Sequence, residues 1–110
     1  MNRGAAAETL AAEFLVKRGV EIIARNYRCR GGEIDLIARD RDMLVFVEVR
    51  LRSNASFGGA AESITAAKRR RLARAAGYYL AALGREPPCR FDAILLDALD
   101  SDRIEWLVDI

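Results

Sequence analysis

The sequence predicts an α/β sandwich in which helices flank a central mixed β-sheet, formed by one domain over residues 1–110. Three observations support this prediction. The chain has 110 residues, of which 52% are apolar and 31% charged, which is typical of one soluble globular domain. Five short apolar runs indicate strands. Two alanine-rich segments indicate helices, one before the strands and one between the third and fourth, which gives the order αβββαββ.

The first half of the chain is predicted to fold as a helix followed by a three-stranded meander. Residues 5–18 are rich in alanine, and Leu10 and Phe14 share one helical face. Gly19 stands where a helix end is expected. Three apolar runs follow, separated by a Gly-Gly pair and by a short polar turn. The strands predicted from these runs are residues 20–28, 33–38 and 43–51.

The second half is predicted to contain a loop, a long helix and two further strands. Gly-rich residues 53–59 indicate the loop. The helix is predicted over residues 62–83, with Ser63 as its N-cap. The strands are predicted at residues 90–97 and 103–109. A helix between two groups of strands indicates a mixed sheet.

Composition narrows the chemistry that the chain can perform. The net charge is only +2, and histidine is absent, so any catalysis depends on carboxylates, Lys, Arg or a metal. Cys29 and Cys89 stand alone, which excludes a zinc site of the usual Cys/His type and indicates reduced thiols. No apolar run approaches the roughly 18 residues of a membrane span. We therefore expect a cytoplasmic protein that does not contact membranes.

Two carboxylates interrupt strands that otherwise look buried. Asp35 stands within EIDLI and Glu48 within FVEVR. A two-residue turn at Arg41 and Asp42 would place Asp35 directly across from Glu48, and Leu36 across from Val47. Val45, Val47, Val49 and Leu51 would form an apolar face covered by the helices, with Ile34, Leu36 and Ala38 beside them. The opposite face would carry Asp35, Glu48 and Arg50, because a slip of one residue would bury the carboxylates in the valine core.

Two interpretations of this acidic pair remain open. Two close carboxylates repel each other, and a divalent cation such as Mg²⁺ would relieve the repulsion while leaving room for a substrate phosphate. Arg50 would then contact the same phosphate. Alternatively, Asp35 and Glu48 belong to a lattice of salt bridges with Arg50, Arg39 or Arg52 on an exposed sheet face.

The second predicted helix contains a basic segment. Its cations, with Arg52, are candidates for binding nucleic-acid phosphates around the carboxylates. They are Lys68, Arg69, Arg70, Arg71 and Arg74. Lys68 is the best candidate to face the acidic pair, because it falls near the start of the helix. The alternative is that the segment is simply a solvated helix face.

The motifs resemble those of the YraN-like family of small bacterial proteins. The resemblance rests on GEIDLIARD with LVFVEVR, on FGGAAESITAAKRRRLARAAGYYL, and on RFDAILLD. That family is in turn similar to PD-(D/E)XK nucleases, close to Holliday junction resolvases. The resemblance implies a restriction-endonuclease-like three-layer sandwich. It also implies a metal-dependent endonuclease acting on DNA, including branched DNA, as a homodimer in which two sites address two strands.

The same resemblance assigns roles to individual residues. Asp35 and Glu48 match the acidic residues of the nuclease motif and would bind Mg²⁺ or Mn²⁺, with the backbone carbonyl of Val49 as a further ligand. Glu8, in GAAAE, matches a helical glutamate beside that metal. Arg50 stands where the motif has lysine. Arginine keeps the charge that stabilises a phosphate transition state, but it cannot act as a base.

Because Arg50 stands where the nuclease motif has lysine, other functions stay open. Another cation such as Lys68 would take over the lysine's role, or the protein would be a catalytically weak or inactive nucleic-acid-binding or scaffold protein. A third interpretation is a protein-interaction module with a salt-bridged sheet face. The sequence does not distinguish DNA from RNA or identify the preferred nucleic-acid structure.

Overall fold

The element order of the structure is αβββαββ, as the sequence predicts. A computed structural model describes residues 3–51, 64–97 and 103–110. The elements are α1 (Arg3–Lys17), β1 (Glu21–Cys29), β2 (Gly32–Asp40), β3 (Met43–Leu51), α2 (Ala66–Leu83), β4 (Cys89–Leu96) and β5 (Ile104–Leu107).

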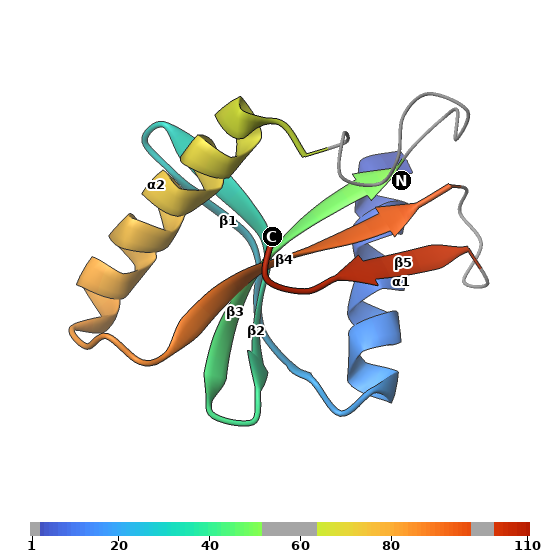
Figure 1. Cartoon of the computed structure of the whole chain (residues 1–110), viewed down its shortest axis with the longest axis horizontal. Coiled ribbons are helices and arrows are strands. Elements are labelled where there is room, and N and C mark those ends of the chain that lie inside the picture. Colours follow the sequence, from blue (N-terminus) through green and yellow to red (C-terminus); the bar gives the residue numbers. More distant parts are fainter. Residues whose placement is uncertain (1–2, 52–63, 98–102) are drawn as a thin grey trace.

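The strands form one mixed sheet in the spatial order β1-β2-β3-β4-β5. Strands β1, β2 and β3 are antiparallel neighbours and form the predicted meander. Strand β4 pairs with β3 in parallel, because α2 carries the chain back to the same end of the sheet. Strand β5 then pairs antiparallel with β4. Figure 1 shows the twisted sheet between the two helices.

The predicted register between β2 and β3 is confirmed. Leu36 lies opposite Val47, and Asp40 opposite Met43, around a two-residue turn. Arg41 in that turn has a positive φ of 60°. The paired residues end at Leu36 and Val47, so Asp35 and Glu48 are the next residues on the two strands. The hydrophobic pattern and the turn length were therefore sufficient to predict the register as far as Leu36 and Val47, while the direct pairing of Asp35 with Glu48 stays a prediction.

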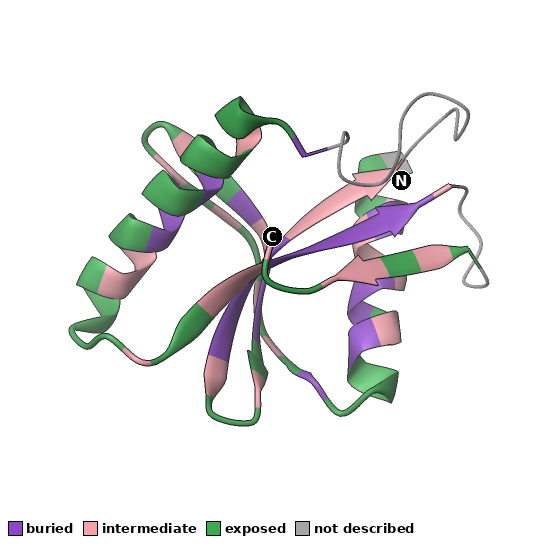
Figure 2. Ribbon diagram, in the orientation of Figure 1, coloured by how far each residue is buried: buried purple, intermediate pink, exposed green. Residues whose placement is uncertain are grey.

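The helices cover opposite faces of the sheet, which corrects the expectation that both cover the valine face. Helix α1 packs on the face of Val45 and Val47, through Ala7, Ala11 and Leu15. Helix α2 packs on the other face, which is also apolar around Ile37, Leu44 and Phe46. The second face therefore also needs a cover, because exposed Phe and Ile would lose the free energy of burial. Figure 2 shows the buried stripe on each helix turned toward the sheet.

The alternation of β2 is irregular beside Asp35, so one facing prediction is wrong. Ile34 was expected on the valine face with Leu36, but it packs with Ile37 and Leu72 beneath α2. In the adjacent strand, Asn26 has a φ of 53° and lies between the partners of Leu36 and Ile34. The backbone is therefore distorted where Asp35 leaves the regular ladder.

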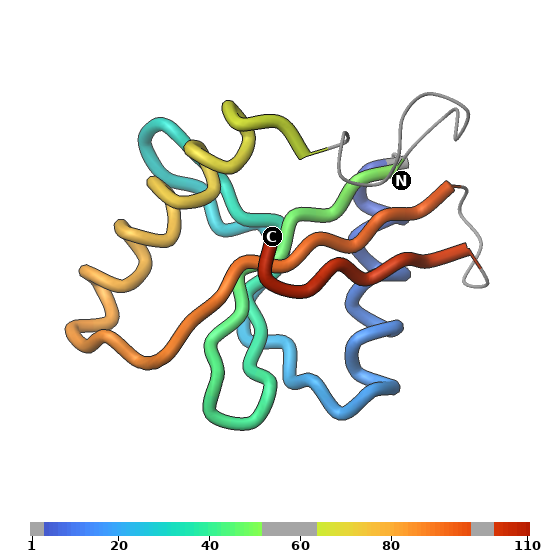
Figure 3. Tube along the Cα trace, in the orientation of Figure 1, coloured from blue at the N-terminus to red at the C-terminus, as the bar shows by residue number. Residues whose placement is uncertain are grey.

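Two element boundaries also differ from the prediction. Helix α2 begins at Ala66, and its N-cap is Thr65, whose Oγ1 accepts a hydrogen bond from the Lys68 amide at 3.2 Å. The expected cap, Ser63, and the loop 53–59 lie outside the described residues. Strand β5 ends at Leu107, and the Ile110 amide then donates to the Phe91 carbonyl at 2.8 Å, so the C-terminal residues lie against β4 (Figure 3).

Neither helix, over the parts of the chain that the structure describes, is long and apolar enough to cross a membrane.

Candidate functional site

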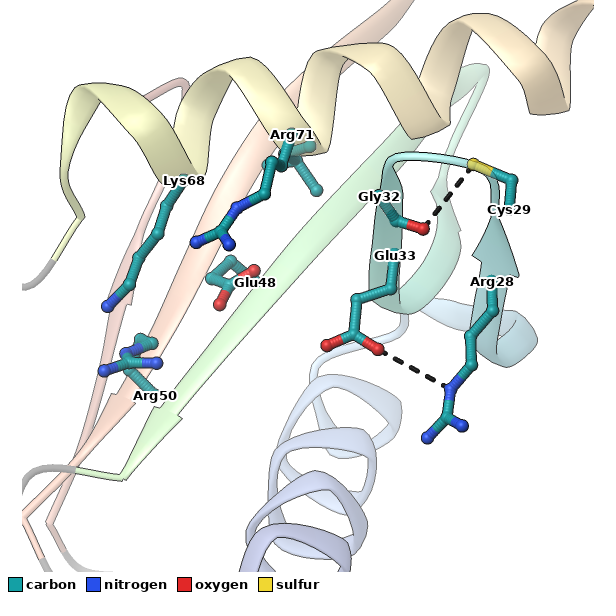
Figure 4. Close-up of a pocket in the computed structure, with 9 residues that line it drawn as sticks. Arg28, Cys29, Gly32, Glu33, Glu48, Arg50, Lys68 and Arg71 are labelled. Atoms are coloured by element: carbon teal, nitrogen blue, oxygen red, sulfur yellow. Dashed lines mark hydrogen bonds and ion pairs between the residues drawn. The ribbon is translucent and has the colours of Figure 1, made fainter.

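A cavity of about 410 Å³ lies between α2, β3 and the hairpin that joins β1 to β2. Its polar side chains come from all three walls. Glu48 and Arg50 belong to β3, Lys68 and Arg71 to α2, and Arg28 and Glu33 to the hairpin. Figure 4 shows Lys68 and Arg71 extending from α2 toward Arg50 and Glu48. The cavity therefore gathers both charges of the motif on β3 and two cations of the basic helix.

Asp35 is held at the point where β2 leaves its ladder with β3. Its Oδ2 accepts a hydrogen bond from the Val49 amide at 2.8 Å. This bond replaces a strand-to-strand contact and fixes one carboxylate oxygen beside the segment that carries Glu48. The donor of this bond is the amide of Val49. The role of the Val49 carbonyl as a metal ligand stays a prediction.

The pKa of Asp35 is raised from 3.8 to about 7. Burial is the main cause, and the negative charge of Glu48 is the next. The hydrogen bond from Val49 lowers the pKa, while Glu8 and Glu33 raise it further. Glu8 on α1 thus acts on Asp35 electrostatically, together with the other acids. Asp35 stands in a negative, poorly hydrated environment that a cation would stabilise.

Burial also raises the pKa of Glu48, and Glu33 contributes in the same direction. Arg50, Lys68 and Arg71 oppose the shift. These cations act from a distance, since within the described residues Glu48 has no hydrogen bond and no ion pair. The Glu48 carboxylate is therefore kept half-buried without a partner of its own, which is costly for an ionised group.

The salt-bridge lattice that the sequence left open does not form among the described residues. Arg39 pairs with Glu21 instead. Arg50 makes no ion pair within the same set, and Arg52 lies outside it. An exposed bridge joins Arg28 Nε to Glu33 Oε2 at 3.6 Å, on the hairpin wall.

The cations of the cavity crowd one another. The pKa of Lys68 is lowered, first by burial and then by Arg50, while Glu48 opposes the shift and Arg71 adds to it. Arg50 and Arg71 thus disfavour the charge of Lys68, and a bound anion would favour it. The site thus has an acidic half around Asp35 and Glu48 and a basic half around Arg50, Lys68 and Arg71.

The acidic half offers carboxylate oxygens, the type of ligand that a hard divalent cation prefers. Mg²⁺ binds oxygen ligands, commonly one or two carboxylates, and keeps several waters. Asp35 and Glu48 supply two carboxylates from adjacent strands. Over the described residues, no three acidic or cysteine side chains are grouped closely enough to hold a metal by themselves. An ion here would therefore take its remaining ligands from water and backbone, as Mg²⁺ does.

The predicted phosphate-binding residues of α2 separate into two groups. Lys68 and Arg71 line the cavity. Arg74 lies over the β1–β2 turn, because a Cβ built on Gly31 would meet its Cδ and Nη1 at 3.0 Å. Arg69 and Arg70 are exposed and do not line the cavity.

Sequence reasoning missed Arg28 as a residue of the cavity wall. The signal that would have found it is the Gly-Gly pair, which places Arg28 opposite Glu33 in a hairpin. Glu33 also lines the cavity, and its side chain is exposed.

Asp92 is an ion-pair partner of Arg90. It is fully buried and accepts hydrogen bonds from Arg90 Nε, from Trp106 Nε1 at 3.0 Å and from the Asp109 amide at 2.9 Å. Both cysteines are free thiols, as predicted.

Comparison with known proteins supports the resemblance that the motifs indicate. Residues 7–96 match the model of the uncharacterised protein family UPF0102. The chain belongs to the UPF0102 family. A UPF0102 protein of Cupriavidus taiwanensis is 59% identical over 106 residues, which cover 96% of this chain and 79% of the relative. UPF0102 proteins of Methylobacillus flagellatus and Nitrosomonas europaea are 57% and 54% identical over 94% and 96% of this chain, and 90% of each relative.

Proposed function

We propose that this UPF0102 protein is a metal-dependent endonuclease that hydrolyses phosphodiester bonds in DNA. The observation that carries the proposal is the separation of charge around one cavity, which Glu48 and several cations line, while Asp35 lies outside the lining and is repelled by the charge of Glu48. Asp35 and Glu48 are crowded acids with raised pKa values. The nearby cations are Arg50, on the same strand as Glu48, and Lys68 and Arg71 on the α2 wall. A divalent cation and a phosphate would relieve both repulsions together.

In this proposal Asp35 and Glu48 hold Mg²⁺ or Mn²⁺, and Glu8 adds negative charge from α1. The ion would supply Lewis-acid stabilisation of the phosphate and help to ionise the attacking water. Hydrolysis forms a bond from the water oxygen to phosphorus and breaks one ester bond, and the water's proton passes to the leaving oxygen. Arg50 donates hydrogen bonds to the phosphoryl oxygens as their negative charge grows. It stays protonated throughout, so it acts through charge alone.

The fold and the family support the proposal at a coarser level. The mixed sheet with one helix on each face and the order αβββαββ suit a restriction-endonuclease-like sandwich. The family description itself carries no activity. The function therefore rests on the site rather than on the fold, since one fold hosts many activities.

A second candidate is a nucleic-acid-binding protein without turnover. The observation that favours it is Arg50 at the motif's lysine position. This protein would bind DNA through the same cations and would bind it equally well with the divalent ion removed.

The test is cleavage of labelled duplex, single-stranded, flapped and four-way-junction DNA in Mg²⁺, Mn²⁺ or EDTA. We expect cutting that requires the metal and falls by about 100-fold or more in Asp35→Asn and in Glu48→Gln, because each removes a charge that holds the ion. Glu13→Gln, an exposed acid on the same helix as Glu8, controls for loss of negative charge. No cutting of any substrate, with DNA binding unchanged by EDTA, would leave the binding protein as the function.

A further inference from the structure

The cations of α2 are not spread evenly around the helix. Lys68, Arg71 and Arg74 follow one another at intervals of three residues. Successive members of such a series are displaced by about 60° around the axis and about 4.5 Å along it. The three therefore form a stripe that begins in the cavity and moves toward one side of the helix. Arg70 points about 160° away from Lys68, on the outer side.

The stripe ends at the β1–β2 turn. Lys68 and Arg71 line the cavity beside Glu48. Arg74 continues past them and packs on Gly31, which leaves room for the arginine because it has no side chain. The start of β2 comes very close to the helix at this point, since a Cβ on Gly32 would lie 2.5 Å from the Arg71 carbonyl oxygen. The hairpin and the helix thus fix one edge of a continuous basic surface.

Two cations of the stripe, Arg71 and Arg74, lack an acidic partner among the described residues. Arg71 and Arg74 make no ion pair with any described residue, and the acid of the hairpin wall, Glu33, pairs with Arg28 instead. The pKa of Lys68 is lowered by burial and by Arg50, and to a smaller extent by Arg71, while Glu48 raises it. Arg71 and Arg74 are exposed, so both guanidinium groups are accessible to an anion.

We propose that Lys68, Arg71 and Arg74 bind two or three successive phosphates of a single strand, which runs from the acidic pair along α2 to the β1–β2 turn. The inference rests on the proposed nuclease function, because that function places the cleaved strand at the acidic pair. The stripe covers about 9 Å of helix axis, and phosphates of one strand in a duplex recur about every 3.4 Å along its axis. The contacts therefore lie on one side of the scissile phosphate, and they recognise backbone rather than base sequence.

The test compares the salt dependence of DNA binding among single-charge variants. Fluorescence anisotropy of a labelled duplex would be measured in EDTA over a range of NaCl concentrations, so that neither metal nor turnover affects the result. Arg71→Ala and Arg74→Ala should each weaken binding by about 5- to 10-fold and reduce the salt slope by about one. Arg70→Ala and Arg85→Ala, which remove the same charge outside the stripe, should bind like the wild type. Alanine favours helix, and circular dichroism would confirm folding.

Each outcome of this experiment decides the proposal. Equal losses in Arg70→Ala and Arg74→Ala would overturn it, because the helix would then act as a diffuse basic surface. Absence of DNA binding by the wild type would also overturn it. A third outcome is that the wild type binds phosphatidylserine vesicles but not DNA, and that the Arg74→Ala variant loses the vesicle binding. That outcome would overturn the proposal and assign the stripe to a membrane surface. If the protein does not cleave DNA but the variants show the predicted pattern of DNA binding, the nuclease function is refuted and the phosphate-binding role of the stripe is supported.

Discussion

Asp35 is the residue whose environment is least favourable to its own charge. It lies half-buried beside Glu48, with Glu8 and Glu33 adding negative charge, and one amide hydrogen bond compensates in part. A carboxylate kept in such a place without a paired arginine costs stability, and sites of this kind are common where function needs them. The cost can be measured separately from any activity.

The cost of Asp35 should depend on pH. Its pKa in the folded protein is about 7, against 3.8 for the free side chain. Below about pH 4 both folded and unfolded chains hold the proton, so no penalty applies. As the pH rises to about 7, only the unfolded chain releases the proton, and the free energy of unfolding falls by roughly 3–4 kcal/mol. Asp35→Asn, which can keep the bond from Val49, should remove most of this loss.

Urea unfolding in EDTA at pH 4.5 and pH 8 would check this prediction. The Asp35→Asn variant should be more stable than the wild type by about 2–3 kcal/mol at pH 8 and by about 1 kcal/mol or less at pH 4.5. Asp42→Asn, an exposed aspartate in the β2–β3 turn, is the matched control. A stabilisation of the same size at both pH values would contradict the explanation by burial and repulsion.

Asp92 shows the opposite situation, a buried acid that is fully paired. Its carboxylate accepts hydrogen bonds from Arg90, Trp106 and the Asp109 amide, and so joins β4 to β5 and the C-terminus. Asp92→Ala should reduce the free energy of unfolding by about 3–5 kcal/mol, because Arg90 keeps only Asp40 as partner. Glu21→Ala breaks the exposed pair with Arg39 and should cost less than about 1 kcal/mol. Similar losses in thermal unfolding of the two variants would refute this assignment.

At the scale of elements, the site depends on how closely α2 approaches β2. Gly32 is the point of contact, where an added Cβ would lie 2.5 Å from the Arg71 carbonyl oxygen and 3.3 Å from the Ala75 Cβ. Neither backbone nor a buried alanine can move aside easily. The glycine therefore sets the separation of helix and hairpin, and through it the positions of Lys68 and Arg71.

Two Gly-to-Ala variants test this contact. Gly32→Ala should lower the free energy of unfolding by about 1–3 kcal/mol, because the helix must shift outward. Gly77→Ala lies in the same helix with nothing within 4 Å of the added Cβ, and it should stabilise by about 0.5–1 kcal/mol through helix propensity. Chemical denaturation measures both. Stabilisation by Gly32→Ala would show that α2 does not approach β2 in this way.

At the scale of the whole molecule, local patterns predicted the order of elements and the register of β2 against β3 from Leu36 to Met43. The alternation of valines in β3 and the two-residue turn at Arg41 and Asp42 were enough to align Leu36 with Val47. These features depend on neighbours in sequence, which is why the sequence reveals them.

Features that depend on long-range packing were less predictable. The covering of the second sheet face by α2 is decided by Phe46 and Ile37, whose apolar character was visible but whose partner was not. The packing of Ile34 beneath α2 accompanies a backbone distortion beside Asn26, for which a period-two pattern carries no signal. Arg28 enters the cavity only because β1 and β2 form a hairpin over the Gly-Gly pair.

The central claim is that Asp35 and Glu48 together bind one divalent cation beside the basic half of the cavity. The most direct measurement is Mn²⁺ binding at pH 8, followed through the electron paramagnetic resonance signal of the free ion. We predict a single Mn²⁺ bound per wild-type chain, with at least about tenfold weaker binding in Asp35→Asn and Glu48→Gln and unchanged binding in Glu13→Gln. Absence of binding by the wild type, or equal binding by all four proteins, would contradict the claim.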